Sequence, residues 1–297
     1  MANTYFVAPN GNDNSPGTEA KPFKTIQRGA KALSAGDTLL VKAGTYVEQI
    51  SVSASGTKNN PITIKAYKED DVLIDGKAGV GGLNAGLPAG QIARTGPLTG
   101  KGFKHTNLVN LTGDYLIWDG INITRSMGTA IAIYKPNNRR PQHTTVRNCK
   151  LSRNRHHALE ILFADHCEIN NVWMDQNVQW VENDIDAVHG ANMNGKFVKN
   201  IKIIDCTISH SFGEAIMIDA NNYDSQFIEV RGCALYDNLW GNLNMAGVSD
   251  IILDSNLIYS STDAFDPSLR YEWIPRGLNL RAREAELGID SSKPGIE

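Results

Sequence analysis

The feature that most constrains the fold is a short segment that recurs along the middle of the chain. In each copy a short apolar strand meets a Gly, Asn, Asp or Ser corner, and a second short strand follows. The six copies are Ile117–Ile123, Thr145–Leu151, Glu168–Met174, Lys202–Ile208, Glu229–Leu235 and Ile252–Ile258. Their fifth residues stand at positions 121, 149, 172, 206, 233 and 256, so the repeat spans roughly 23 to 34 residues. A β-rich repeat of this length predicts a solenoid, because it is too short for a helix-pair repeat or a propeller blade.

A third strand follows the two strands of most copies. It is visible as alternating apolar residues in Ala130–Tyr134, Ala158–Leu162, Asp184–Val188, Ala215–Asp219 and Asn242–Ala246. Three strands per turn, all running the same way, predict an all-β protein with the fold of a right-handed parallel β-helix. Stacked turns of such a coil lie about 4.8 Å apart, so equivalent residues form columns of close neighbours.

The whole chain of 297 residues is predicted to form a single β-helix domain, residues 1–297. Residues 5–76 are predicted to form an N-terminal cap and the first turns, with an amphipathic capping helix over 22–33. The Gly-rich stretch 77–105 is predicted to leave the coil as one long excursion, and the regular turns occupy 106–260. Residues 261–297 form either a C-terminal cap or a truncated end.

Composition and charge exclude several classes of protein. Lys and Arg number 29 against 32 Asp and Glu, so a net charge of -3 argues against a general nucleic-acid binder. No apolar run approaches the roughly 18 residues that a membrane helix needs. The four cysteines lack the spacing of a metal site. Three of them, Cys149, Cys206 and Cys233, fall in one inward column, where they are predicted to pack as small apolar residues.

The third strands supply the candidate chemistry. Their outward residues are mostly small, as the floor of a groove requires, but acids interrupt them at Glu160, Asp184, Asp186 and Asp219. Glu160 and Asp186 are predicted to lie on neighbouring turns, about 5 Å apart. Two carboxylates this close need a proton or a cation between them. The pair therefore predicts a Ca²⁺ site, the acid and nucleophile of a glycoside hydrolase, or a solvated acidic ladder without a role. A zinc site formed by His156, His157 and Glu160 is disfavoured, because His157 and Glu160 are three apart on a strand and point to opposite faces.

Basic residues gather just before these acids. Between Lys135 and Arg155 there are seven Lys and Arg residues and no acid. Such a cluster beside an acidic patch suits an anionic sugar polymer, although a solvated basic loop has the same composition. The residues expected to contact this polymer are Tyr134, Arg153, Trp240, Asn242 and Asn244.

The N-terminal region carries a more specific pattern. It consists of Tyr5–Asp13, Pro16–Thr18, Lys21–Gln27, Ala35–Thr38 and Ala43–Tyr46, continued by Pro61–Lys65 and Ile74–Gly76. This opening resembles the N-terminal cap and first turns of extracellular right-handed β-helix proteins. The resemblance is to polysaccharide lyases of pectate lyase family nine and, more distantly, to chondroitinase and alginate lyases. The chain is strand-like from Tyr5, which fits a cytosolic protein or a secreted one given without its signal sequence. The resemblance favours the secreted, extracellular protein.

The resemblance also implies a cofactor and an activity. Residues 182–187 lie where the family carries an acidic Ca²⁺-binding segment, and residues 211–219 lie where its next acid-rich turn is found. The metal ligands implied are Asp184, Asp186, Glu214 and Asp219. Two departures from the family pattern follow: Phe212 and Gly213 stand in place of paired aspartates, and Asn242–Asn244 offers no lysine where the catalytic base is expected. The remaining catalytic candidates are Lys135, Arg155 and His189 as bases, together with Glu160.

Three functions therefore remain open. The first is an extracellular protein that binds an acidic polysaccharide and cleaves it by Ca²⁺-assisted β-elimination. The second is a glycoside hydrolase that uses Glu160, Asp184 and Asp186. The third is a glycan-binding or spike-like solenoid without catalytic activity. The absence of the expected lysine from Asn242–Asn244 favours this third function.

Overall fold

The computed structural model describes most of the coil. The described residues are 2–76, 107–126, 128–135, 140–141, 143–154, 156–178, 191–211, 213–219, 225–238 and 241–260. The predicted excursion 77–105 and the predicted end segment 261–297 lie outside them.

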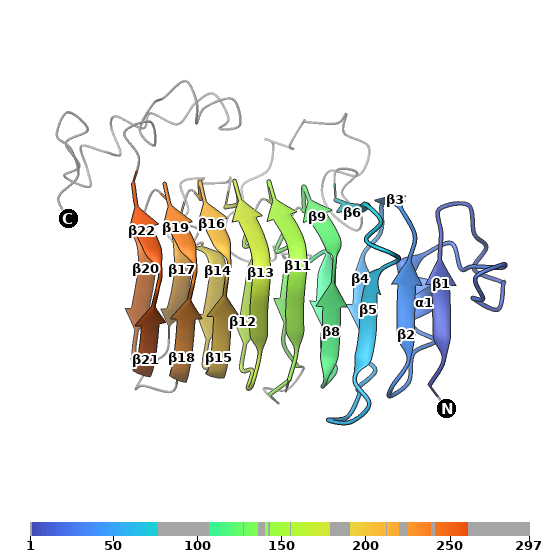
Figure 1. Cartoon of the computed structure of the whole chain (residues 1–297), viewed down its shortest axis with the longest axis horizontal. Coiled ribbons are helices and arrows are strands. Elements are labelled where there is room, and N and C mark those ends of the chain that lie inside the picture. The colour runs from blue at the N-terminus through green and yellow to red at the C-terminus, as the bar shows by residue number, and fades with distance from the viewer. Residues whose placement is uncertain are drawn as a thin grey trace, which may run out of the picture.

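The described strands form a parallel β-helix, as predicted (Figure 1). The first ladder holds β1 (Thr4–Val7), β2 (Thr38–Val41), β5 (Ile62–Ala66), β8 (Leu116–Asp119), β11 (Thr145–Ser152), β13 (Glu168–Asp175), β15 (Lys199–Ile204), β18 (Ser225–Arg231) and β21 (Val248–Asp254). Along the second ladder run β3 (Gly44–Tyr46), β6 (Val72–Asp75), β9 (Ile121–Thr124), β16 (Thr207–Ser209), β19 (Ala234–Tyr236) and β22 (Leu257–Tyr259). β11 and β13 continue from the first ladder into the second.

A separate seven-stranded sheet, here called the third sheet, closes each turn. It consists of β4 (Ile50–Val52), β7 (Val109–Leu111), β10 (Ile131–Ile133), β12 (Leu159–Leu162), β14 (Ala191–Lys196), β17 (Glu214–Asp219) and β20 (Gly241–Ala246). All of its strand pairs are parallel. From β2 to β20, each turn therefore adds one strand, or one part of a long strand, to each of the three faces.

The corner between the first two ladders confirms the predicted repeat. One residue per turn adopts a left-handed conformation there, with φ between 51° and 72°. These residues are Gly120, Asn148, Asn171, Asp205, Gly232 and Ser255. Gly tolerates this conformation because it has no Cβ, and the short polar side chains of Asn and Asp tolerate it better than most.

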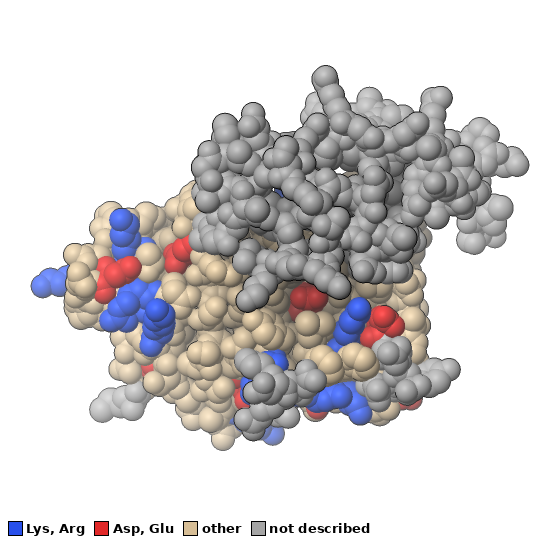
Figure 2. All heavy atoms as spheres, turned by 180° about the vertical axis from the view of Figure 1, so that it is seen from behind, with Lys and Arg blue, Asp and Glu red and all other residues tan. Residues whose placement is uncertain are grey.

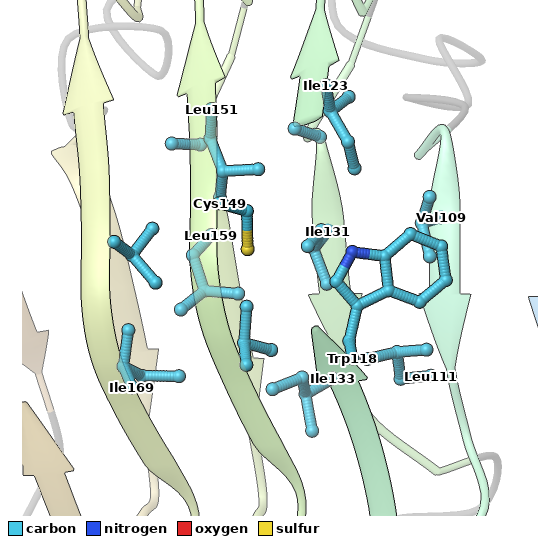
Figure 3. Packing of buried hydrophobic residues seen from close by; sticks show 14 of the residues in the cluster. Val109, Leu111, Trp118, Ile123, Ile131, Ile133, Cys149, Leu151, Leu159 and Ile169 are labelled. Atoms are coloured by element: carbon cyan, nitrogen blue, oxygen red, sulfur yellow. The ribbon is translucent and has the colours of Figure 1, made fainter. Parts of the chain in front are cut away.

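The interior of the coil is filled by aliphatic side chains and one tryptophan. Trp118 is fully buried and lies beside Val109, Leu111, Ile131 and Ile133, which the third sheet directs inward (Figure 3). Its indole Nε1–H donates to the carbonyl of Ile121 at 3.3 Å, so the one polar atom of the ring is satisfied.

The predicted cysteine column is confirmed. Cys149 is paired with Val172, and Cys206 and Cys233 occupy the same position on later turns. All three are buried and form no disulfide, and the same holds for Cys167. They pack as small apolar groups in the core.

We expect none of the four thiols to react with a thiol-specific disulfide reagent in the native protein. Burial raises the pKa of Cys149, and it raises the pKa of Cys167 to about 12, so the reactive thiolate of these two is scarce as well as inaccessible. The hydrogen bond with Cys206 lowers the pKa of Cys233, and there the 1% exposure alone keeps the reagent out. Ellman titration in buffer and then in guanidinium checks this. The native sample should remain unreacted, and the denatured sample should release four equivalents.

The predicted N-terminal helix is present but shorter than expected. Helix α1 covers Ile26–Ala30, whereas the pattern predicted 22–33. Phe23 is held in extended backbone by a parallel bridge to Val7, which prevents the helix from starting earlier. The Glu48 carboxylate accepts the backbone N–H groups of Ile26 and Gln27, each at 2.9 Å. The helix packs on β1, β2 and β4 at the N-terminal end of the coil (Figure 1), and its role as a cap stays a prediction.

A ladder of buried polar side chains follows the second corner of five turns. Its positions are Ser126, Asn154, Asn177, Ser211 and Asn238. Each Asn side chain bonds backbone or side-chain groups on the turn before it. At position 211 the ladder has Ser instead of Asn, and Asn192 of β14 supplies the missing amide. Its Oδ1 accepts from Asn177 Nδ2 at 2.7 Å, and its Nδ2 donates to Asn238 Oδ1 at 3.3 Å.

No helix among the described residues is long and apolar enough to cross a bilayer.

Candidate functional site

The outer face of the third sheet carries one row of side chains that crosses six turns, here called the outer row. In strand order it comprises Asn110, Ala132, Glu160, Asn194, Met217 and Asn244. Two of these residues, Glu160 and Asn244, were predicted site residues. The outer row places Glu160 in the middle of the face, flanked by Ala132 on one side and Asn194 on the other.

The predicted neighbour of Glu160 was wrong. The strand that pairs with β12 is Ala191–Lys196, and the residue opposite Glu160 is Asn194, not Asp186. The strand was missed because its inward positions are Met193 and Gly195, which give almost no apolar alternation. Glycine is not sterically required at position 195, because an added Cβ would make only ordinary contacts, the shortest with Ile218 at 3.4 Å. The adjacent carboxylate pair predicted from Glu160 and Asp186 is therefore replaced by a carboxylate next to an amide.

Glu160 has a histidine beside it instead. His157 lies in the corner that precedes β12, where side chains no longer alternate between the two faces of the sheet. It therefore reaches the same face as Glu160, and the predicted opposite orientation was wrong. Its Nε2 lies 4.0 Å from Glu160 Oε1 and 3.4 Å from Asn194 Nδ2. His157 is 2% exposed, and the side chain of Glu160 is 19% exposed.

The environment of Glu160 favours its protonated form. Burial raises the pKa of Glu160, while the charge of Lys196 and a hydrogen bond from Asn194 partly oppose that shift. A carboxyl group held in this way can donate a proton at a pH where an exposed glutamate is ionised.

Lys196 is a site residue that the sequence reasoning missed. It ends β14 on the outer face, two residues beyond Asn194, and it lies opposite Leu162 and Asp219. It was overlooked because the strand that carries it was not predicted. The Gly195-Lys196-Phe197 sequence gives no motif, and only the correct register would have revealed it.

A second polar pair lies further along the same face. Asn244 Nδ2 donates to Glu214 Oε1 at 3.2 Å. Glu214 is 4% exposed, and its Oε2 is buried without a hydrogen-bond partner among the described residues. The predicted ligand Asp219 ends the same strand, five residues on and hence about 16 Å away, so Glu214 and Asp219 cannot hold one ion.

The other predicted site residues are spread over the coil. Lys135 forms an ion pair with Asp114, and its neighbour Tyr134 lies at the end of β10. Arg153 occupies the second corner and donates through Nε to Gln176 Oε1 at 3.2 Å. Asn242 bonds the polar ladder from β20: its Oδ1 accepts from Asn238 Nδ2 at 2.8 Å and its Nδ2 donates to the Tyr259 carbonyl. The predicted residues Arg155, Asp184, Asp186, His189 and Trp240 lie outside the described residues.

The described members of the basic run do not all gather on the third sheet. Arg147 projects from the first ladder and pairs with Asp119 at 2.9 Å, and Lys150 projects from the second ladder over the ring of Trp173. Residues close in sequence are thus distributed to different faces by the coil. On the side of the molecule in Figure 2, acidic and basic side chains of the described residues are interspersed.

Comparison with known proteins places this coil in a family. Residues 5–195 match the model of the Pel9A-like right-handed β-helix region. The uncharacterized protein YwoF of Bacillus subtilis is 40% identical over 73 residues, which cover 25% of this chain and 16% of YwoF. The pectate lyase PEL9 of Emericella nidulans is 34% identical over 79 residues, which cover 26% of this chain and 19% of PEL9.

The matched segments thus span less than a fifth of either curated relative. The crystal structure of pectate lyase Pel9A superimposes with a TM-score of 0.62 at 17% identity, over 82% of this chain and 55% of that one. At this identity the superposition establishes the fold alone. The family model spans well over half of the chain, and the chain therefore belongs to the Pel9A-like right-handed β-helix family.

Proposed function

We propose that this protein is a polysaccharide lyase that cleaves a uronate-containing polysaccharide by β-elimination on the outer face of the third sheet. The observation that carries the proposal is the placement of Lys196 and Glu160 on neighbouring strands of that face. Membership of the Pel9A-like family, and the pectate lyase activity in the names of PEL9 and Pel9A, support the reaction class.

The two side chains suit the two proton transfers of the reaction. Lys196, as the free amine, takes the proton from C5 of the uronate, and the electrons of that C–H bond form the double bond between C4 and C5. The bond from C4 to the glycosidic oxygen breaks, and the protonated Glu160 donates its proton to the leaving oxygen. Glu160 and Lys196 are one strand and two residues apart, about 8 Å between Cα atoms, which leaves room for one sugar ring between their ends.

An acidic substrate is supported by the chemistry of elimination. The proton at C5 is acidified by the adjacent carboxyl group, and more strongly when a cation neutralises that group. A neutral glycan lacks that carboxylate and offers no comparable proton. Since such polymers lie outside cells, the proposal includes the predicted secretion.

Calcium remains a prediction. Ca²⁺ takes six to eight oxygen ligands, and no group of three His, Cys, Asp or Glu side chains converges among the described residues. The described part of the face therefore does not fit the ion by itself. Asp184 and Asp186, the other predicted ligands, lie outside that part, so no step of the proposed mechanism passes through calcium.

The proposed function is tested by product chemistry. The purified protein is incubated with pectate, alginate, a glycosaminoglycan and a neutral glucan, first with Ca²⁺ and then with a chelator. We expect ultraviolet absorbance of an unsaturated uronide from at least one acidic polymer and none from the glucan. Reducing ends without that absorbance would indicate a hydrolase, and binding without either product would indicate a glycan-binding protein. Loss of the absorbance on chelation would establish the calcium requirement.

A further inference from the structure

The side-chain oxygen of Asn194 is a buried acceptor that lacks a donor. Asn194 stands next to Glu160 in the outer row and is 3% exposed. Its amide nitrogen is used, because Nδ2 faces His157 Nε2 at 3.4 Å and donates to the Glu160 carboxyl group. Its Oδ1 has no hydrogen-bond partner among the described residues, and the next residue of the row, Met217, has no donor to offer. Burial of an unpaired acceptor is unfavourable, so this oxygen calls for a donor from a ligand.

The contacts of His157 determine which way the Asn194 amide faces. His157 Nδ1 lies 2.8 Å from the carbonyl oxygen of Ala191, and a carbonyl can only accept, so the proton of the neutral ring is on Nδ1. The Ala191 N–H, which would suit the other tautomer, is further away at 3.2 Å. With the proton on Nδ1, Nε2 is an acceptor and takes a hydrogen from Asn194 Nδ2. Turning the amide over would set Oδ1 against the lone pair of Nε2, so Oδ1 is held away from the histidine.

The unpaired oxygen lies where the proposed reaction places a sugar ring. Asn194 is paired with Glu160 across the strands, and Lys196 follows two residues later on the same strand. The side chain of Glu160 is 19% exposed, so this part of the face is open to a ligand. A uronate linked through C1 and C4 keeps free hydroxyl groups on C2 and C3. Either hydroxyl group can donate the hydrogen bond that Oδ1 lacks.

We propose that Asn194 Oδ1 accepts a hydrogen bond from the C2 or C3 hydroxyl group of the uronate, and that His157 is the positioning residue that keeps the amide turned for this contact. The inference rests on the proposed function, which puts the uronate between Glu160 and Lys196. It adds a requirement on the substrate, because the sugar at the cleaved bond must carry a free hydroxyl group. A polymer with esterified hydroxyl groups leaves Oδ1 unpaired and is a poor substrate.

The requirement is tested with one polymer in two forms. The acidic polymer that yields the unsaturated product is acetylated on C2 and C3, and kcat/KM is measured for the free and the acetylated form. We expect the wild-type protein to prefer the free form by about tenfold or more, and the preference of Asn194→Ala to fall to about threefold or less. The ratio is taken within one variant, so a general loss of activity through the Glu160 contact cancels. An unchanged preference in Asn194→Ala overturns the proposal.

Three further variants separate the hydroxyl contact from packing. Asn110→Ala is the matched control: it removes a mostly buried amide from the same row, two strands before Glu160, and should keep the wild-type preference. His157→Gln retains an acceptor for the amide of Asn194 and a donor for the Ala191 carbonyl, so it should also keep the preference. His157→Leu fills a similar volume without either group and should lose most of the preference. A wild-type preference in His157→Leu overturns the positioning role.

Two measurements keep this inference separate from the proposed elimination. The NMR shifts of the ring nitrogens of His157 in the wild-type protein report the tautomer: we expect a protonated Nδ1 and an unprotonated Nε2, and the reverse overturns the assigned orientation of Asn194. Calorimetric titration compares the affinity for the free and acetylated polymers without cleavage. A preference for the free polymer that Asn194→Ala abolishes, in a protein without elimination, refutes the lyase alone. Elimination at equal rates on both forms refutes the hydroxyl contact alone.

Discussion

Replacing Lys196 with alanine is expected to lower kcat for β-elimination by about 10²- to 10⁴-fold, the usual contribution of a positioned acid or base. Lys196 is the lysine that β14 presents on the outer face, next to the turn that carries Glu160. The alanine variant keeps the strand but has no atom that reaches the substrate proton. The initial rate of absorbance increase on the preferred polymer measures the effect, and binding of the same polymer shows whether affinity is retained.

Lys202→Ala is the matched control for this variant. Lys202 projects from the first ladder, is 56% exposed and lies 3.7 Å from Glu229, so its loss removes the same charge from a different face. It should retain full activity, because exposed ion pairs contribute little to stability. If Lys196→Ala elimination stays within about twofold of wild type, Lys196 is not the base. The predicted bases Arg155 and His189 would then be tested next.

The repeat predicted the fold because each turn obeys the same local rules. Gly120, Asn148 and Asp205 mark the corners since Gly, Asn and Asp are the residue types that adopt left-handed backbone most readily. Cys149, Cys206 and Cys233 mark an inward column since small apolar side chains are interchangeable there. These signals are local in sequence, and a coil of stacked turns needs little other information.

The site was harder to predict because it depends on register over distances that vary between turns. Ile185 and Ala187 alternate as a strand should, whereas Met193 and Gly195 form the strand that pairs with β12. The strand that pairs with β12 thus lies further along the chain than predicted. The neighbour of Glu160 is therefore Asn194 and not an acid, and Lys196 was not recognised as a residue of this face. His157 was misjudged because the rule of alternating faces ends where the strand ends.

Asn177→Ala is expected to destabilise the coil by about 3 kcal/mol or more, since it leaves several buried groups unpaired at about 1–3 kcal/mol each. Asn177 is 1% exposed. Its Oδ1 accepts the backbone N–H of Asn154 at 3.0 Å and its Nδ2 at 2.8 Å. Its own Nδ2 donates to the Leu151 carbonyl and to Asn192 Oδ1. Alanine removes all four bonds. It also leaves Asn192 Oδ1 without the Asn177 amide, although Asn192 supplies the amide that the ladder lacks at Ser211.

The measurement is the urea midpoint, followed by circular dichroism and by tryptophan fluorescence. Asn170→Ala in β13 is the control: Asn170 bonds only Glu168 Oε1 among the described side-chain contacts, at 3.1 Å, and should cost less than about 1 kcal/mol. Asn177→Ser should fall between the two, because serine loses the bonds to the preceding turn but keeps a hydroxyl that can bond within its own turn, as Ser126 and Ser211 do with the N–H groups of Gly128 and Gly213. Equal midpoints for Asn177→Ala and Asn170→Ala would show that the ladder contributes no more than an ordinary surface amide. A graded order would show that the buried amides, and not the apolar core alone, hold successive turns in register beneath the face that carries Glu160 and Lys196.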